Sequence, residues 1–179
     1  MALGLDILAI GVCTVDQIAV VPTFPQPDGR LDMREFMPAI GGIAAVAAIP
    51  AARLGARVGF AGLVGDDPHG RDIRAALDKD GVDTTLLAVS AAVQTPTAII
   101  ISDRATGTRS ILNHPAIATF RLAPSDAVVR AAVAARYVHL DHTAFPTSPT
   151  PCCRPARWRV YWSASTPGWI SPASSATCP

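Results

Sequence analysis

Apolar and polar positions follow two periods along the first 141 residues, and together they are typical of an α/β protein. Short, uninterrupted apolar runs predict buried strands, because strands of a parallel sheet are covered on both faces. We expect such strands at 5–12, 58–64 and 137–140. Segments with apolar residues spaced three and four apart, and one segment rich in alanine, predict helices between the strands. We expect helices from the Gly41-Gly42 pair to about Gly55, from Asp67 to Gly81, and over 126–135.

A second set of strands carries turn signals between its members. A strand is expected over 14–21, closed by Pro22, and 30–37 alternates apolar and charged residues as an exposed strand does. Segments 98–102 and 109–112 flank the turn sequence 105–108, which predicts a hairpin. Strands alternating with helices predict a three-layer α/β sheet with helices on both faces. The hairpins predict a small β lid beside that sheet.

Composition excludes several classes of protein. The chain has 50% hydrophobic and 16% charged residues, a balance that argues against a disordered protein. A net charge of +1 gives no reason to expect nucleic acid or a membrane surface as a partner. The N-terminus has no basic segment, and Asp6 interrupts its apolar run, so no secretion signal is predicted. We therefore expect a cytoplasmic protein.

The pattern changes after Asp141. All 14 acidic residues lie at or before that position, whereas the three tryptophans and seven of the sixteen prolines follow it. From Pro146 onward no periodicity predicts a helix or strand. We therefore expect a folded part over 1–141 and a separate, disordered tail over 142–179. One hypothesis is a shift of reading frame shortly after Leu140; the alternative is a genuine proline-rich extension.

The Gly41-Gly42 pair and Asp16 form the first candidate site. Two glycines allow close approach of a ligand to the backbone, and the helix behind them directs free N–H groups toward it. The carboxylate of Asp16 is able to accept hydrogen bonds from sugar hydroxyls. The alternative is a tight strand-to-helix turn that binds nothing. A further turn, Gly65-x-Asp67-x-x-Gly70, predicts a helix with Asp67 as N-cap and Pro68 as its first residue.

With this spacing, and with the phrase Ala52-Arg53-Leu54-Gly55-Ala56, the chain from 6 to 141 resembles the N-terminal half of the ribokinase-like (PfkB) carbohydrate kinases. The resemblance implies a ribokinase-like sheet with a β lid, incomplete in its C-terminal half. It implies a sugar-like small molecule bound by Asp16, Gly41, Gly42 and the residue at position 46. In the intact family, MgATP phosphorylates a sugar or nucleoside hydroxyl. A homodimer formed through the β lid is a further expectation.

The chain departs from the family pattern within the helix. Position 46 is an asparagine in the family and binds substrate hydroxyls, but here it is Val46. A sugar hydroxyl buried against valine would lose roughly 1–3 kcal/mol of hydrogen bonding. Ile43 replaces another frequent asparagine, and Pro50 falls inside the helix, where proline costs about 3 kcal/mol. These changes indicate either a site no longer under constraint or a family branch with a more apolar substrate.

The catalytic segment of the family has no counterpart in these 179 residues. The resemblance implies a segment of the type Asp-Thr-x-Gly-Ala-Gly-Asp, whose last aspartate is the general base and whose amides hold the transferring phosphate. The sequence also contains no Walker loop. We therefore expect no catalytic residue, poor binding of MgATP and no kinase activity from this chain as it stands. The alternative function is a non-catalytic module that binds a small ligand.

Two other constellations are weaker candidates. His139-x-Asp141-His142 lacks a further ligand at a suitable spacing, so we expect no metal site there. Asp141 ends a predicted parallel strand, where ligands of α/β sheets bind, and a minor substrate role is an open alternative. A nicotinamide-dependent enzyme is disfavoured, because the residues after the first strand lack Gly-x-Gly-x-x-Gly.

Overall fold

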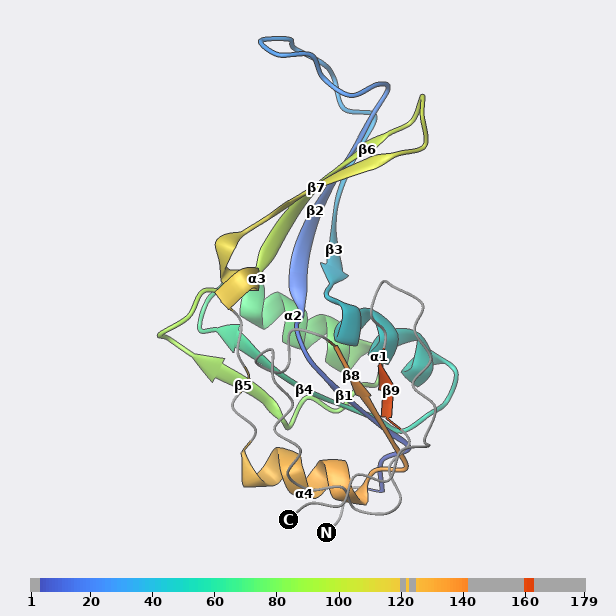
Figure 1. Ribbon diagram of the computed structural model, residues 1–179, viewed down its shortest axis with the longest axis vertical. Coiled ribbons are helices and arrows are strands. Elements are labelled where there is room, and N and C mark those ends of the chain that lie inside the picture. The colour runs from blue at the N-terminus through green and yellow to red at the C-terminus, as the bar shows by residue number, and fades with distance from the viewer. Residues whose placement is uncertain (1–3, 120–121, 123–124, 142–159, 163–179) are drawn as a thin grey trace, which may run out of the picture.

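The computed structural model describes residues 4–119, 122, 125–141 and 160–162, whose strands form two sheets (Figure 1). The larger sheet has the strand order β5-β4-β1-β8-β9, and every neighbouring pair is parallel. Parallel strands need covered crossovers, and helices supply them here. The strands are β1 (Ile7–Ile10), β4 (Val58–Gly65), β5 (Leu87–Ser90), β8 (Tyr137–Leu140) and β9 (Val160–Trp162).

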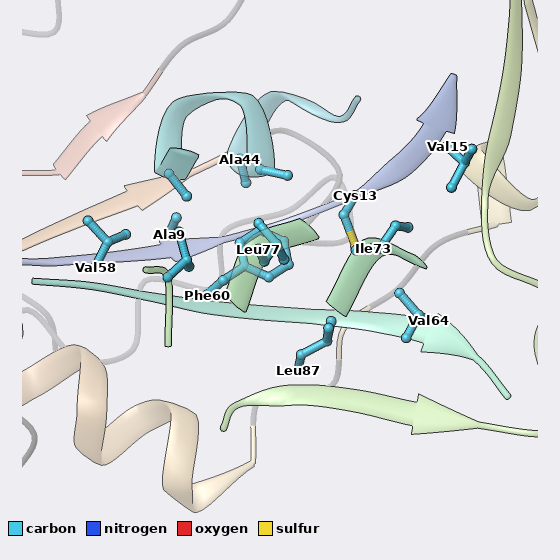
Figure 2. Packing of buried hydrophobic residues seen from close by; sticks show 13 residues of the cluster. Ala9, Cys13, Val15, Ala44, Val58, Phe60, Val64, Ile73, Leu77 and Leu87 are labelled. Atoms are coloured by element: carbon cyan, nitrogen blue, oxygen red, sulfur yellow. The ribbon is translucent and has the colours of Figure 1, made fainter. Parts of the chain in front are cut away.

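Helices cover both faces of this sheet. Alternation along β1 divides the core, because Ala9 packs toward one face while Leu8 and Ile10 pack toward the other. The Ala9 face holds α1 (Ile43–Arg53) and α2 (Pro68–Lys79), and its fully buried residues surround Phe60 (Figure 2). The opposite face holds α4 (Asp126–Ala134). The expected three-layer α/β sheet is therefore confirmed.

The second sheet is the lid, and it stands at one end of the layered part (Figure 1). Its order is β3-β2-β6-β7, in which β2 pairs parallel with β6 and antiparallel with β3, and β6 and β7 form the expected hairpin. The chain passes from β1 into the lid through residues 11–13. The lid strands are β2 (Thr14–Val21), β3 (Glu35–Gly41), β6 (Thr97–Asp103) and β7 (Arg109–Asn113), followed by the short helix α3 (Pro115–Thr119).

The expected strand over 30–37 was wrong in its bounds, since β3 spans 35–41. Cross-strand pairing decides this, because Gly41 pairs with Thr14 and Glu35 with Val20. Pro38 lies inside β3, where the sequence pattern gave no reason to extend a strand. It is tolerated because β3 is an edge strand and its outward side needs no ladder hydrogen bond. As a result, β3 leads directly to α1.

Local signals at the helix ends are confirmed. Asp67 caps α2 by accepting a hydrogen bond from the Gly70 N–H at 2.8 Å, with Pro68 as the first helical residue. Gly55 follows α1 with φ 93°, as a left-handed C-terminal glycine does. Pro50 lies inside α1, as expected. The pattern did not predict β5, α3 or β9, and β9 pairs with β8 beyond the expected boundary at 141.

None of the helices described is long and apolar enough to cross a membrane.

Candidate functional site

An open cleft of about 480 Å³ lies where the lid meets the first turns of α1. Its volume falls in the range of small-molecule sites, roughly 300–1,000 Å³. Asp16 of β2 enters it from the lid, and His139 of β8 from the parallel sheet. The structure thus brings the four expected substrate residues, Asp16, Gly41, Gly42 and Val46, to one cleft. The lining residues are Asp16, Ile40, Gly41, Gly42, Ile43, Val46, Ala47 and His139.

The position of Asp16 is fixed by its neighbours. The Thr14 hydroxyl is buried and donates a hydrogen bond to Asp16 Oδ1 at 2.6 Å. A Cβ added at Gly41 would collide with the Asp16 carboxylate and with the Thr14 hydroxyl. The carboxylate therefore lies directly against the backbone of Gly41, at the point where β3 ends. This arrangement holds an acceptor for hydroxyl groups at the wall of the cleft.

Gly42 is required by the turn that starts α1. Its φ of 91° is unfavourable for residues with a side chain, and a Cβ there would lie 2.7 Å from Cys13 Cα. The first turn of α1 contains no acidic residue, and Gly42 has no side chain to cap it. Its free N–H groups and the positive end of the helix dipole are consequently available to a ligand. Gly42 is needed by the backbone of the turn and Gly41 by the close approach of Asp16 and Thr14, whether or not a ligand binds.

The α1 wall of the cleft is apolar and exposed. Val46 is 53% exposed and Ile43 is 38% exposed, although both are hydrophobic. Neither side chain is able to hydrogen-bond a hydroxyl. A ligand that covered Val46 would gain contact with its apolar edge and would leave any hydroxyl at that point unpaired.

His139 and Asp141 mark the end of β8. Burial lowers the pKa of His139, although the charge of Asp141 acts in the opposite direction. Asp141 is 3% exposed, accepts a hydrogen bond from the Val12 N–H at 2.8 Å and packs against Gly11. No group of three or more metal-ligating side chains gathers among the described residues. His142 lies outside those residues, so the absence of a metal site stays a prediction.

The Gly65-x-Asp67-x-x-Gly70 turn connects the parallel sheet to the lid. Asp67 accepts hydrogen bonds from both the N–H and the hydroxyl of Thr95, two residues before β6. The Thr95 hydroxyl in turn accepts from the Gly65 N–H at 2.9 Å. Burial acts to raise the pKa of Asp67, but the hydrogen bonds from Thr95 and Gly70 outweigh it, so the pKa is lowered. This turn is a structural joint outside the cleft lining.

Sequence reasoning missed two residues of the site. The sequence pattern predicts Thr14 only as the first residue of a strand, and it places His139 only in the weak metal-ligand constellation with Asp141 and His142. Both could have been found from the period of two in strands. Thr14 shares a strand face with Asp16, and His139 pairs with Ala9, whose face carries α1.

Comparison with known proteins identifies the fold and the family. The sequence model described as pfkB family carbohydrate kinase matches residues 5–175. A nucleoside kinase from Methanothermobacter thermautotrophicus is 32% identical over 137 residues, or 75% of this chain and 43% of that protein. An uncharacterized sugar kinase from Pyrococcus horikoshii is 27% identical with a TM-score of 0.63, covering 75% of this chain and 42% of its own. Arabidopsis thaliana ribokinase, complexed with ribose and ATP, has a TM-score of 0.65 at 22% identity, covering 78% and 46%.

The chain thus spans less than half the length of these relatives. The fold they share is the ribokinase-like α/β fold, here in its N-terminal part. The family match continues past residue 141, so the expected boundary between the folded part and the tail stays a prediction.

Proposed function

The chain belongs to the pfkB family of carbohydrate kinases, and from this premise we propose that its Asp16 cleft binds the phosphate acceptor, a sugar or a nucleoside. In the complete kinase the donor would be MgATP. The observation that carries this proposal is the position of the Asp16 carboxylate, which is hydrogen-bonded by Thr14 and lines the cleft together with the first turn of α1. Substrate contact by Asp16, Gly41 and Gly42, with Val46 beside them, is part of the proposal.

The chemistry of the cleft supports a polyhydroxylated ligand. A carboxylate accepts hydrogen bonds from neighbouring hydroxyls, and such charge-assisted bonds are about twice as strong as neutral ones. The α1 N–H groups add donors for hydroxyl oxygens. The apolar α1 wall provides a surface for the C–H face of a sugar ring.

Phosphoryl transfer needs a positioned base and charge stabilisation of the transferring group. These 179 residues contain no Asp-Thr-x-Gly-Ala-Gly-Asp segment to supply either. We therefore propose that this chain alone binds the acceptor without phosphorylating it and does not hold MgATP well. The alternative function is a ligand-binding module that works without catalysis, favoured by the hydrogen-bonded joint between the parallel sheet and the lid.

Calorimetric titration of the full chain tests substrate binding. D-ribose, D-fructose and adenosine are suitable probes, each with and without MgATP. Asp16→Asn keeps the size of the side chain but removes its charge, and we expect affinity to fall by about tenfold. Asp72→Asn is the matched control, because Asp72 is exposed on α2 and outside the cleft lining. Equal affinities for the wild type and Asp16→Asn would contradict the proposal.

Release of ADP, measured in the same samples, separates the two functions. Ligand binding without release of ADP supports a chain that binds the acceptor and does not catalyse its phosphorylation. Steady turnover would show that these residues supply a base and a nucleotide site, and would overturn the proposed lack of activity.

The origin of the tail, residues 142–179, is the subject of a separate hypothesis. Sequencing the coding DNA from the codon of Tyr137 onward, and translating all frames, tests the proposed shift of reading frame. A catalytic segment of the family type in another frame would support the shift. Its absence would support a genuine extension.

A further inference from the structure

The cleft has two polar side chains at different walls, and the proposed function uses one of them. Asp16 belongs to the lid sheet, whereas His139 belongs to β8 of the parallel sheet. The α1 residues between them, Ile43, Val46 and Ala47, are apolar. A ligand that fills the cleft therefore meets hydrogen-bonding side chains at two walls and hydrocarbon along the third.

The fold directs His139 to the side of the sheet that carries α1. Its neighbours Val138 and Leu140 pack into the cluster beneath α4, and side chains alternate along a strand. The cross-strand partner of His139 is Ala9, whose short side chain is buried on the α1 face. His139 therefore lies on the α1 side of the sheet, next to a residue with a small side chain, and lines the cleft.

The Nε2 atom of His139 is buried and has no hydrogen-bond partner within the part of the chain that the structure describes. A buried polar nitrogen without a partner is unfavourable, and native structures rarely leave one. Burial lowers the pKa of His139, so the ring is largely neutral at pH 7 and offers one donor and one acceptor. The ring is suited to a hydroxyl group, which satisfies either kind of nitrogen.

We propose that His139 hydrogen-bonds a hydroxyl of the bound ligand while Val46 contacts a carbon that carries no hydroxyl, so that the cleft selects deoxy sugars or deoxynucleosides. This inference rests on the proposed function. It assigns the recognition of a ligand hydroxyl to His139 at the β8 wall, because the side chain of Val46 is unable to form a hydrogen bond. It also explains an exposed Val46 at a binding surface, since a CH₂ group of the ligand would cover it.

Matched ligand pairs test the selection in the full chain. The pairs are D-ribose with 2-deoxy-D-ribose and adenosine with 2′-deoxyadenosine, titrated by calorimetry. We expect the deoxy member to bind about fivefold to tenfold more tightly, and Val46→Asn to reverse that order. His139→Leu should weaken the preferred ligand by a similar factor, and His139→Gln, which keeps donor and acceptor atoms, should recover part of it.

Nitrogen-15 NMR of the wild type provides a readout that needs no variant. Addition of the preferred ligand should shift the Nε2 resonance of His139. The resonances of His114, whose Nδ1 accepts the Ala116 N–H outside the cleft lining, should stay in place. A His139 resonance that does not move under saturating ligand would overturn the proposal, even if His139→Leu failed to fold.

The outcomes distinguish the two proposals. If no sugar or nucleoside binds the wild type, both fail. If Asp16→Asn weakens binding while His139→Leu leaves every affinity unchanged, the proposed function stands and the role of His139 is excluded. A preference for the fully hydroxylated member of both pairs would likewise exclude the selection by Val46.

Discussion

The carboxylate of Asp16 lies against the α-carbon of Gly41, in the space that a side chain at position 41 would fill. The Thr14 hydroxyl closes the same space and hydrogen-bonds the carboxylate. Gly41 is therefore needed to seat Asp16, apart from any contact with a ligand. A change at position 41 should act on binding through the displacement of Asp16.

Gly41→Ala should reduce both ligand affinity and stability. The added methyl group has no room, so Asp16 and Thr14 must move, at a cost of about 1–3 kcal/mol in the free energy of unfolding. We expect sugar affinity to fall about tenfold as the carboxylate leaves its position. Urea unfolding and calorimetric titration measure the two effects.

Gly107→Ala is the matched control. Gly107 lies in the lid hairpin turn, and its φ of 70° makes alanine unfavourable by about 1–2 kcal/mol. The space around it is open, so an added methyl group displaces no neighbour. Stability should fall while affinity stays constant. A Gly41→Ala protein that kept full affinity would contradict the proposed seating of Asp16.

Thr95→Val should loosen the joint between the parallel sheet and the lid. The valine keeps the shape of the side chain but removes the hydroxyl that accepts from the Gly65 N–H and donates to Asp67. A buried N–H group loses its partner, so we expect a loss of about 1–3 kcal/mol in the free energy of unfolding. Thr106→Val, in an exposed turn, should lose less than about 0.5 kcal/mol. Equal losses in urea unfolding would argue against the joint.

Elements governed by local chemistry could be predicted from the sequence. Asp67 and Pro68 start α2 because a cap and a fixed φ act within one turn. Gly55 ends α1 for a similarly local reason. The β6–β7 hairpin follows from its turn, in which Gly107 has positive φ. These features depend on few neighbours, so one sequence contains enough information.

Features that depend on long-range pairing could not be predicted in the same way. The bounds of β3 follow from its register with β2, which no pattern within 30–41 contains. The four residues of β5 become a strand by pairing with β4. At the site, Asp16 and the glycines were predicted from their spacing, but His139 arrives there through the pairing of β8 with β1.

Asp6→Asn should remove part of the increase in folding stability that the wild type gains as the pH rises from about 2 to about 5. Hydrogen bonds from the Arg57 side chain lower the pKa of Asp6 to about 2, and the Arg57 backbone N–H adds another. A lowered carboxylate pKa stabilises the folded state above the unfolded value of about 3.9, and this stability is lost as pH falls toward 2. Thermal melts from pH 5 to pH 2 should therefore fall less steeply for Asp6→Asn. Asp126→Asn is the control, and parallel pH profiles for Asp6→Asn and the wild type would contradict the expectation.

Ile99→Lys should disrupt a homodimer formed through the lid, if the chain associates as the family resemblance implies. Ile99, Phe36 and Leu112 share the lid face opposite Asp16, and each is more than 50% exposed. An exposed apolar face of this kind marks association, and a buried unpaired lysine would oppose it. Light scattering during gel filtration should show twice the chain mass of 18.6 kDa for the wild type and a single chain mass for Ile99→Lys.

Ile111→Lys is the matched control for that experiment, because Ile111 is 48% exposed on the lid face that carries Asp16. We expect this variant to remain dimeric while losing affinity for sugars, since the charge would stand on the face turned toward the cleft. The reverse result, a dimer broken by Ile111→Lys alone, would place the interface on the cleft face. A monomeric wild type would exclude the lid dimer. The ligand would then bind to a single chain.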